Sequence, residues 1–290
     1  MKLRIRTIEN GEYVKAKRLW AECFPEDDGE FIEYYFANRT SPDNIIGVFD
    51  GDGKMLGGLH IIGQKLRICG TEKRIGFIAG VGTKPEHRNR GIASKLLEAA
   101  VSVMRDRGCA AAVLQPFNDN FYKKYGYRDF VFAGRCKSVT PTEHKNENYD
   151  EKSLLSKYNA FMAGYDGYAV RDEGTYTNLI KEFSANNAKI FSLGDSYALV
   201  YAGSGVEPAQ VMEFVGNGDA SALASVIKSS FGDADILVPT DSPLCEPGSI
   251  SVFNQILPID EQKLTDGTGF LNADSLIKHI NLHGFALDRY

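Results

Sequence analysis

The segment from Val81 to Ala93 combines residue types and a spacing that suit anion binding. It reads Val81-Gly-Thr-Lys-Pro-Glu-His-Arg-Asn-Arg-Gly-Ile-Ala93, so that a strand pattern leads through a polar loop into a helix pattern. The spacing Arg88-x-x-Gly91-x-Ala93 places small residues where a backbone can approach a ligand closely. Because the first N–H groups of a helix lack intrahelical partners and carry the positive end of its dipole, such a segment can hold phosphate or pyrophosphate.

Two common phosphate-binding motifs are absent from this segment. It has no Gly-Lys-Ser/Thr, which a nucleoside-triphosphate loop needs, and no Gly-x-Gly-x-x-Gly after the strand. The loop does carry further basic side chains, namely Lys84, His87, Arg88 and Arg90. From this segment alone, an ordinary solvated loop between a strand and a helix remains an alternative.

A second segment makes the pattern more specific, because the two together resemble the GNAT superfamily of N-acetyltransferases. Val81–Ala93 is similar to the acetyl-CoA motif of that superfamily, Arg/Gln-x-x-Gly-x-Gly/Ala. Asn118-Asp-Asn-Phe-Tyr-Lys-Lys-Tyr-Gly-Tyr127 is similar to its next motif, Asn-x-x-Phe-Tyr-x-x-x-Gly-Phe/Tyr. The motifs occur in the expected order and at the expected distance, and the resemblance covers about residues 1–135.

Details outside the two motifs resemble the enhanced intracellular survival (Eis) type of tandem-domain acetyltransferase. These details are Trp20-Ala-Glu-Cys-Phe-Pro-Glu-Asp-Asp28, the start Pro85-Glu-His-Arg88, and Leu114-Gln-Pro-Phe117. The Eis type usually carries a third, sterol-carrier-like domain. Only about 50 residues follow the expected strand Asp235–Val238, so we expect this chain to lack that domain and not to be a lipid carrier.

The resemblance implies where acetyl-CoA binds. The strand residues Val81, Gly82 and Thr83 would pair with the pantetheine arm and polarise the thioester carbonyl through backbone N–H groups. Phe117 and Asn118 would line the same arm. The pyrophosphate would be held by the loop and the first helical turn, namely Arg88, Asn89, Arg90, Gly91, Ile92, Ala93 and Ser94.

The resemblance also assigns a general acid, Tyr122, which would protonate the departing thiolate. A phenol with a pKa near 10 is a credible donor to a thiolate whose pKa is about 8.5 or higher. The alternative for Tyr122 is a packing role in an aromatic cluster, which is the role we expect for Phe121, Tyr125 and Tyr127.

The general base and the groups that contact the acceptor are less well defined. In Eis-type enzymes the C-terminal carboxylate can act as the base, and here that would be Tyr290. Glu22, Asp27 and Asp28 could contact a cationic acceptor, or they form a solvated acidic helix start.

The elements that must position these residues alternate along the first half. The expected strands are Leu3–Thr7, Ile45–Asp50, Met55–Ile62, Lys65–Cys69, Ile75–Val81 continuing to Thr83, Ala110–Gln115 and Tyr127–Val131. The expected helices are Glu12–Phe24, Glu30–Asn38, Gly91–Arg107 and Asp119–Tyr125.

The second half repeats this order of elements loosely after the polar linker Thr140–Tyr149. Its expected helices are Ser153–Met162, Tyr176–Asn186, Ala220–Phe231 and Ala273–Leu282, and its expected strands are Lys189–Leu193, Tyr197–Tyr201, Val211–Val215, Asp235–Val238 and Ser251–Ile256. We therefore expect an α/β (α+β) fold of tandem GNAT-like domains, with a mixed central sheet flanked by helices. The expected domains are 1–138, which binds the cofactor, and 150–290, which is degenerate.

Two features argue against a cofactor site in the second domain. The loop Gly216-Asn-Gly-Asp219 lacks the Arg or Gln of the motif, and Asp219 falls at the N-cap of a helix, where its carboxylate would occupy the free amides. Residues 1–140 hold 23 basic and 17 acidic side chains, whereas residues 141–290 hold 10 and 21. The second half thus carries −11, which suits the wall of a pocket for a cationic amine better than a phosphate site. The alternative is that this half is simply an acidic, solubilising domain.

Composition excludes several classes of protein. Of 290 residues, 43% are hydrophobic and 24% are charged, which is the mix of an ordinary globular protein. No apolar run could span a bilayer or serve as a signal peptide, so we expect a cytoplasmic protein without membrane partners. A pI of about 5.6 without a basic face argues against nucleic-acid binding. The sequence is compatible with a homo-oligomer.

Neither the cysteines nor the histidines predict a metal site. The five cysteines, Cys23, Cys69, Cys109, Cys136 and Cys245, are scattered singly, without a C-x-x-C pair. His279 and His283 have a metal-like spacing on a helix pattern, but no third ligand is visible.

The leading hypothesis is an N-acetyltransferase that moves an acetyl group from acetyl-CoA to a primary amine. The acceptor would be a small cationic amine or a lysine side chain, and transfer would be direct, through a tetrahedral intermediate. The alternative is a non-catalytic acetyl-CoA-binding regulatory protein.

Overall fold

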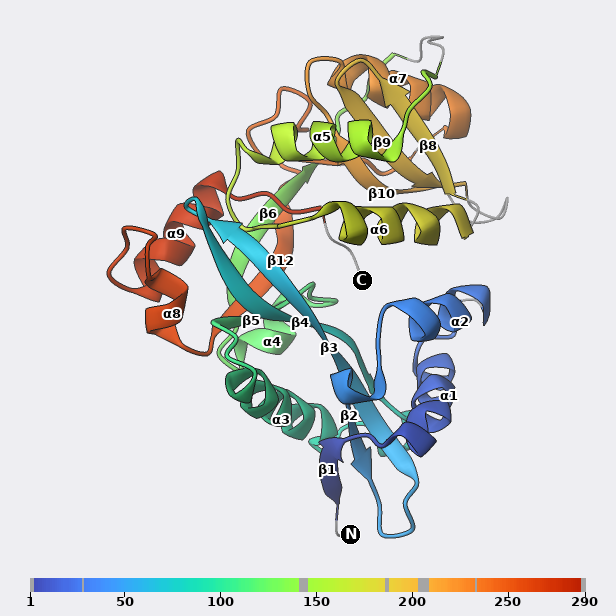
Figure 1. The fold of residues 1–290 in the computed structure, drawn as a ribbon, viewed down its shortest axis with the longest axis vertical. Coiled ribbons are helices and arrows are strands. Elements are labelled where there is room, and N and C mark those ends of the chain that lie inside the picture. Colours follow the sequence, from blue (N-terminus) through green and yellow to red (C-terminus); the bar gives the residue numbers. More distant parts are fainter. Residues whose placement is uncertain are drawn as a thin grey trace.

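A large mixed sheet runs through the molecule in the computed structural model, which describes residues 3–27, 29–140, 146–185, 188–202, 209–232 and 234–287. Among these residues nine strands form the sheet, in the order β1-β2-β3-β4-β5-β12-β6-β11 with β7 beside β3 (Figure 1). Its strands are β1 (Arg4–Thr7), β2 (Ile45–Phe49), β3 (Met55–Ile68), β4 (Thr71–Thr83), β5 (Ala111–Leu114), β6 (Arg128–Arg135), β7 (Tyr168–Ala169), β11 (Leu237–Val238) and β12 (Ser251–Pro258). Only β4 and β5 pair in parallel among the described strands.

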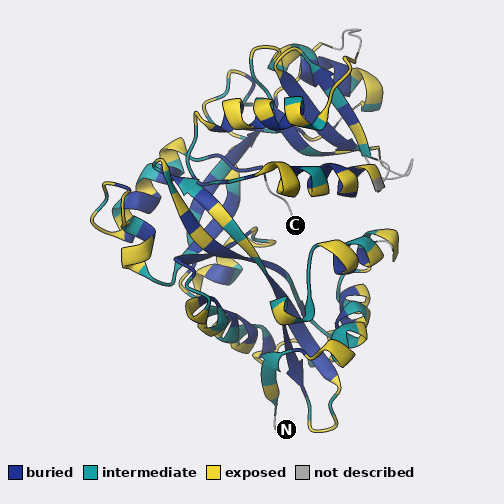
Figure 2. Ribbon diagram, in the orientation of Figure 1, coloured by how far each residue is buried: buried dark blue, intermediate teal, exposed yellow. Residues whose placement is uncertain are grey.

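Helices cover both faces of this sheet near its start. α3 (Ile92–Asp106) packs on one face, while α1 (Tyr13–Cys23) and α2 (Gly29–Asn38) pack on the other (Figure 1). The alternation of strand side chains explains the arrangement, because Ile46 and Val48 of β2 face α3 whereas Ile45 and Phe49 face α1 and α2. The central stretches of β2, β3 and β4 are accordingly buried, and the outer sides of the helices are exposed (Figure 2).

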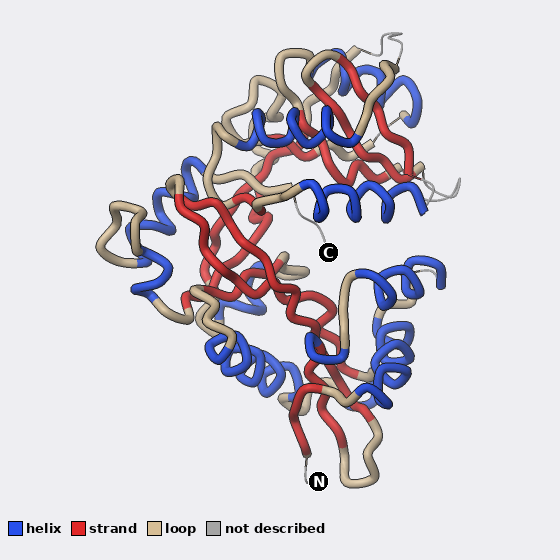
Figure 3. The backbone as a smooth tube through the Cα atoms, in the orientation of Figure 1, coloured by secondary structure: helices blue, strands red, loops and turns tan. Residues whose placement is uncertain are grey.

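A second sheet is formed by β8 (Ala188–Leu193), β9 (Ser196–Tyr201) and β10 (Gln210–Val215), in the order β10-β9-β8. On β9, Tyr197 and Leu199 face α5 (Glu151–Met162) and α6 (Glu173–Ala185), whereas Ala198 and Val200 face α7 (Ala220–Phe231). Figure 3 shows helices on the outside of both sheets. The expected fold class, a mixed sheet flanked by helices, is confirmed.

The remaining helical elements are short or lie near the chain end. They are α4 (Asp119–Lys123), α8 (Glu261–Thr265), α9 (Ala273–His283) and the 3₁₀ turns η1 (Asn10–Glu12), η2 (Pro42–Asn44) and η3 (Pro85–His87). No helix in the described part of the chain is long and apolar enough to cross a membrane.

The second half completes the sheet of the first half. β12 lies between β5 and β6, and its Ile256 pairs with Val113 on one side and Arg128 on the other. One buried cluster also joins the halves, since it contains Phe77 of β4, Tyr158 of α5 and Leu276 of α9. The division of the chain at 138 and 150 stays a prediction, but the nine-stranded sheet and this buried cluster both contain residues from either side of it.

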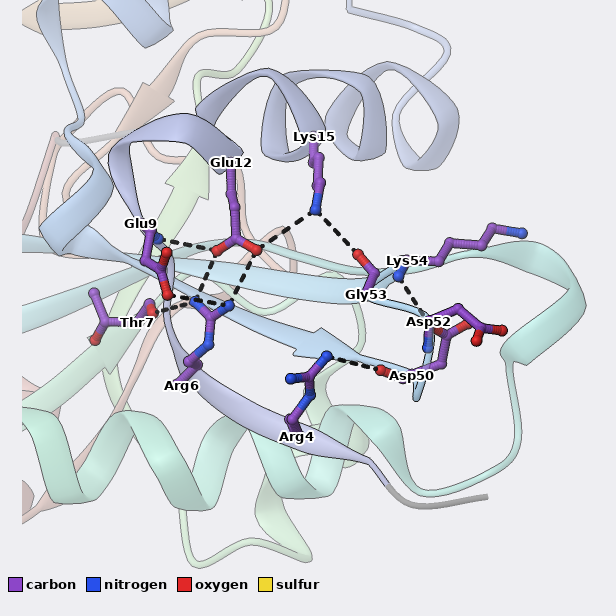
Figure 4. A network of polar contacts seen from close by, with 10 residues as sticks. All are labelled: Arg4, Arg6, Thr7, Glu9, Glu12, Lys15, Asp50, Asp52, Gly53 and Lys54. Carbon is purple, nitrogen blue, oxygen red and sulfur yellow. Dashed lines mark hydrogen bonds and ion pairs between the residues drawn. The ribbon is translucent and has the colours of Figure 1, made fainter.

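A network of polar contacts holds β1, η1 and α1 against the hairpin between β2 and β3 (Figure 4). The Arg6 guanidinium donates two hydrogen bonds to the Glu12 carboxylate, at 2.7 and 3.0 Å. Lys15 lies 3.5 Å from the same carboxylate and donates to the Gly53 carbonyl at 3.1 Å. The hydrogen bonds from Arg6 hold the pKa of Glu12 at about 2, well below its ordinary value.

Two expected elements are longer than their patterns indicated. Met55–Ile62 and Lys65–Cys69 were expected as separate strands, but β3 continues through Gly63 as one strand to Ile68. β4 likewise runs unbroken from Thr71 to Thr83. The pairing of these two long strands along their whole length explains the continuity, because each supplies the ladder partner of the other.

Candidate functional site

β4 separates from β5 in the middle of the sheet. The two strands pair only from Ile75 to Ile78 on β4 and from Ala111 to Leu114 on β5. Beyond that point Ala79–Thr83 has no strand partner on the β5 side among the described residues, although β3 still pairs with it on the other side. This stretch therefore offers backbone groups to an extended ligand, as a strand edge does.

A β-bulge accompanies the separation. The register of β3 and β4 shifts between Gly58 and His60, so that β4 has an extra residue opposite Leu59. Gly80 lies in this bulge with a φ of 57°, a left-handed conformation that glycine adopts without strain. Bulges of this kind bend a strand and often lie beside active sites.

Trp20 and Cys23 of α1 lie directly on this end of β4. A Cβ atom at Gly80 would come within 2.3 Å of the Trp20 ring, and one at Gly82 would lie 3.0 Å from the Cys23 side chain. Only glycine therefore allows α1 to approach the strand so closely. The sequence motifs placed Trp20 and Cys23 in the Eis-like segment and predicted no contact with β4, although the alternate glycines of β4 were a signal of close packing. Burial raises the pKa of Cys23, so this thiol stays protonated.

The loop after β4 leads directly into the exposed start of α3. Gly91 is the N-cap of α3 with a φ of 73°, and a Cβ atom there would meet nothing within 4 Å. Asn89 is also left-handed, with a φ of 60°. Arg88 donates from Nε to the Thr83 carbonyl at 3.2 Å, which ties the loop to the end of β4. The backbone here is open to a phosphate-bearing ligand.

The structure brings most of the expected cofactor residues to this place. Val81, Gly82 and Thr83 form the free end of β4, and the loop residues Arg88, Asn89 and Arg90 are exposed beside it. Ile92 is buried under α3, whereas Ala93 and Ser94 are half-buried in its first turn. The Ser94 hydroxyl lies 2.8 Å from the Tyr125 hydroxyl, so the segment around α4 contacts this turn.

Tyr122 is held rigidly beside these elements. It is 4% exposed and packs in one cluster with Ile78, Leu114 and Ile92. Ile78 and Leu114 are the last paired residues of β4 and β5, and Ile92 is the first residue of α3. Its ring contacts those of Phe117, Phe121 and Tyr127, with centroids 4.9 to 5.9 Å apart. Burial raises the pKa of Tyr122 to about 12, so the phenol keeps its proton at neutral pH.

The surroundings of Phe117 agree with its expected role beside the cofactor, whereas the Asn118 side chain has a structural partner. Phe117 is 75% exposed, which is unusual for a large apolar side chain and leaves it free to cover a ligand. The Asn118 side chain instead caps α4 by accepting a hydrogen bond from the Asn120 N–H at 3.0 Å.

The acidic residues expected near the acceptor are only partly brought together. Asp27 accepts a hydrogen bond from Trp20 Nε1 at 2.7 Å and lines a pocket. Glu22 instead forms an ion pair with Lys84 at 2.6 Å. Asp28 and Tyr290 lie outside the described residues.

The pocket beside Asp27 lies between the two halves and has a volume of about 240 Å³. Its charged lining residues are Asp27, Arg39, Arg171, Glu182 and Glu213. Arg39 pairs with Glu182 at 2.6 Å, and the buried Arg171 pairs with Glu213 at 2.7 Å. Trp20 lines this pocket and also covers Gly80, so its side chain contacts both the pocket and the bulge of β4.

In the second half, the turn between β10 and α7 differs in one respect from what the sequence predicted. The strand and helix expected there are β10 and α7, with Asp219 at the N-cap. However, the Asp219 carboxylate makes no capping hydrogen bond to α7 and accepts one from the Asp195 N–H at 3.4 Å instead. The carboxylate lies over Gly194, in the tight turn between β8 and β9, where a Cβ atom would come within 1.9 Å of it. The hydrogen bond in this turn holds the carboxylate away from the first turn of α7.

Comparison with known proteins agrees with these features. Residues 4–129 match the family model described as an acetyltransferase (GNAT) domain. A 63-residue stretch is 40% identical to N-alpha-acetyltransferase 30 of Schizosaccharomyces pombe, and it covers 20% of this chain and 41% of that protein. The chain thus spans less than half the length of this curated relative.

Solved structures share the fold over most of the chain. A GCN5-related N-acetyltransferase from Kribbella flavida superposes with a TM-score of 0.66 at 20% identity, covering 89% of this chain and 72% of that one. Eis1 from Mycobacterium abscessus superposes with a TM-score of 0.63 at 16% identity, covering 89% and 74%. The resemblance to GNAT domains is thereby confirmed for the first half, and the resemblance to the Eis type is confirmed at the level of the fold.

Proposed function

We propose that this chain is an N-acetyltransferase that uses acetyl-CoA and acetylates a primary amine. The observation that carries the proposal is the separation of β4 from β5 at the bulge of Gly80, next to the open start of α3. A free strand edge suits the amide-rich pantetheine arm, and an uncovered helix start suits the pyrophosphate. The family match over residues 4–129 supports the same assignment.

The chemistry would use backbone groups and one phenol. The amine nitrogen attacks the thioester carbonyl, and N–H groups of Val81–Thr83 stabilise the oxyanion that forms. When the tetrahedral intermediate collapses, the carbon–sulfur bond breaks and Tyr122 gives its proton to the leaving thiolate. The proton that the amine nitrogen loses passes to solvent, and solvent returns a proton to the Tyr122 oxygen, so that the step balances. With its pKa at about 12, the Tyr122 phenol is protonated before the step, as a general acid must be.

The acceptor would enter through the pocket between the halves. Three carboxylates and two guanidinium groups line it, so the local charge favours a cationic amine. Among the carboxylates that line the pocket, Asp27 comes from the first half of the chain and lies beside Trp20. The acceptors that fit this description are small cationic amines and exposed lysine side chains.

A thiol-release assay with a panel of aminoglycosides, polyamines and lysine peptides tests the proposal. An acetyltransferase releases coenzyme A at a rate that depends on at least one amine. A regulatory protein built on the same fold would bind acetyl-CoA without any amine-dependent release, and that outcome would overturn the proposal.

A further inference from the structure

Three potential metal ligands meet at the far end of the β3–β4 hairpin, away from the bulge of β4. Cys69 comes from the hairpin turn, Asp166 from the segment between α5 and β7, and His279 from α9. Figure 1 shows the tip of this hairpin reaching α9. The sequence pattern had offered only His279 and His283, because the other two residues are distant along the chain.

The distances between the ligand atoms are those of a metal site. The Sγ atom of Cys69, a carboxylate oxygen of Asp166 and a ring nitrogen of His279 all lie within 4.8 Å of one another. Asp166 Oδ2 is 3.1 Å from His279 Nε2 and 3.8 Å from Cys69 Sγ. Tetrahedral zinc bonds of about 2.0–2.3 Å place neighbouring ligand atoms roughly 3.3–3.6 Å apart, so small adjustments would suffice.

We propose that Cys69, Asp166 and His279 bind one Zn²⁺ ion. The set combines thiolate, imidazole and carboxylate, which are the three ligand types that zinc takes in proteins. Three protein ligands leave the fourth tetrahedral position to water. All three residues are partly exposed, so an ion can reach them. The site is independent of the proposed acetyl transfer.

The backbone at Cys69 supports a specific role for its thiol. Ile68 pairs with Thr71, so Cys69 and Gly70 form a two-residue turn in which both have positive φ, at 46° and 75°. Turns of this type favour Asn-Gly, because a left-handed residue with a larger side chain is strained. Such strained positions concentrate at functional sites.

The charges around the thiol also favour a cation. The Asp166 carboxylate accepts a hydrogen bond from the Cys69 backbone N–H and lies beside its sulfur. The neighbouring cation, Lys73, donates to the carbonyl groups of Lys263 and Asp266. A divalent ion would bring together a thiolate and a carboxylate that otherwise repel each other.

Cobalt substitution tests the proposal on the full chain. The protein is treated with a chelator, freed of it and titrated with Co²⁺, which reports thiolate ligation through a sulfur-to-metal charge-transfer band. We expect one equivalent to bind, with the ligand-field bands of a tetrahedral site, and Zn²⁺ to displace it. Absence of the charge-transfer band would overturn the proposal.

Matched variants identify the ligands. Cys69→Asn should abolish the charge-transfer band and weaken Zn²⁺ binding at least tenfold, while the turn itself becomes more favourable. Asp166→Asn and His279→Gln should each weaken binding similarly. Cys245→Ser removes a half-buried thiol outside the cluster and should leave the band unchanged. A band that survives Cys69→Asn, or disappears in Cys245→Ser, would contradict the site.

Thermal stability gives a second readout that does not depend on spectroscopy. Zn²⁺ that binds only the folded chain must raise its Tm, and the increase should vanish in Cys69→Asn. An equal Tm increase in both proteins would place the bound ion elsewhere and overturn the proposal.

Discussion

At the scale of single residues, the sequence motifs predicted which residues could do chemistry but not the side chains that surround them. The roles of Tyr122 and Gly91 stay predictions that rest on the motifs and their resemblance to GNAT enzymes, and the structure places both residues beside the free end of β4. The contacts of Trp20 with Gly80 and of Cys23 with Gly82 could not be predicted, because they join a helix and a strand that are distant in the chain. The spacing of residues along a sequence shows which residues share one helix or strand, but not which helices and strands pack together.

Replacing Tyr122 with phenylalanine tests the general acid. The ring would still fill its place in the aromatic cluster, so acetyl-CoA affinity should be unchanged, while kcat should fall about 100-fold or more. Steady-state kinetics and calorimetry measure the two effects. Tyr127→Phe is the matched control, since it removes a buried hydroxyl without a hydrogen-bond partner from the same cluster. Equal kcat values for the two variants would remove Tyr122 from the mechanism.

The pKa of Tyr122 adds a pH dependence to this prediction. A value of about 12 lies above the ordinary value of 10.0, so the acid stays protonated as pH rises through the neutral and mildly alkaline range. The kcat profile should therefore show no loss of activity between about pH 8 and 10 that depends on Tyr122. A descending limb in that range that is absent from Tyr122→Phe would contradict the burial of this phenol.

Replacing Gly91 with glutamate tests the cofactor cradle. The added carboxylate would project into the open space at the start of α3, where it would exclude and repel a pyrophosphate. Acetyl-CoA binding, measured by calorimetry, should be lost. Gly108→Glu is the matched control, because Gly108 has nearly the same φ, 72° against 73°, and equally open space at the other end of α3. Unchanged affinity in Gly91→Glu would refute the cofactor assignment.

At the scale of elements, periodicity located nearly every helix and strand but not their partners. The helix expected over Gly91–Arg107 corresponds to α3, and the burial of one of its faces confirms it. The bulge of β4 and the insertion of β12 between β5 and β6 depend on hydrogen bonds between remote segments. No local sequence pattern predicts the bulge or the insertion, although both determine the geometry of the site.

The polar network at the N-terminus gives a prediction about stability. Glu12→Gln should lower the free energy of unfolding by about 1–2 kcal/mol at neutral pH, because it removes charge-assisted hydrogen bonds from Arg6. The folded pKa of Glu12, about 2, lies below its unfolded value, so this contribution is present above about pH 5 and is lost as pH falls toward 2. Chemical denaturation at several pH values measures the difference.

A matched control for this network is Glu33→Gln. Glu33 pairs with Lys17 at 2.6 Å, but its side chain is 71% exposed. Its loss should change stability by less than about 0.5 kcal/mol. If the two variants are equally stable, or if the effect of Glu12→Gln does not shrink toward acid pH, the network does not hold α1 in place.

At the scale of the whole molecule, the halves are joined by shared structure and differ in charge. β12 and one continuous buried cluster join them, and a pocket lies where they meet. The opposite charges of the two halves were visible in the sequence, but the pocket was not, because its walls come from α1, α2, α6 and β10. Charge is a property of composition, whereas a pocket needs the tertiary structure.

The stoichiometry of cofactor binding tests the division of roles between the halves. We expect one acetyl-CoA per chain, because the turn between β10 and α7 lacks the basic loop of the first half. Calorimetric titration of the full chain gives the number directly. Two equivalents would show that the second half also binds the cofactor.

The most direct test of the account follows the acetyl group itself. The full chain is incubated with acetyl-CoA that carries an isotope label in its acetyl group and with the amine panel, and the products are identified by mass spectrometry. The account predicts a labelled N-acetyl amide and an equal amount of free coenzyme A, both greatly reduced in Tyr122→Phe. Binding of acetyl-CoA without any labelled amide, across the whole panel, would contradict it.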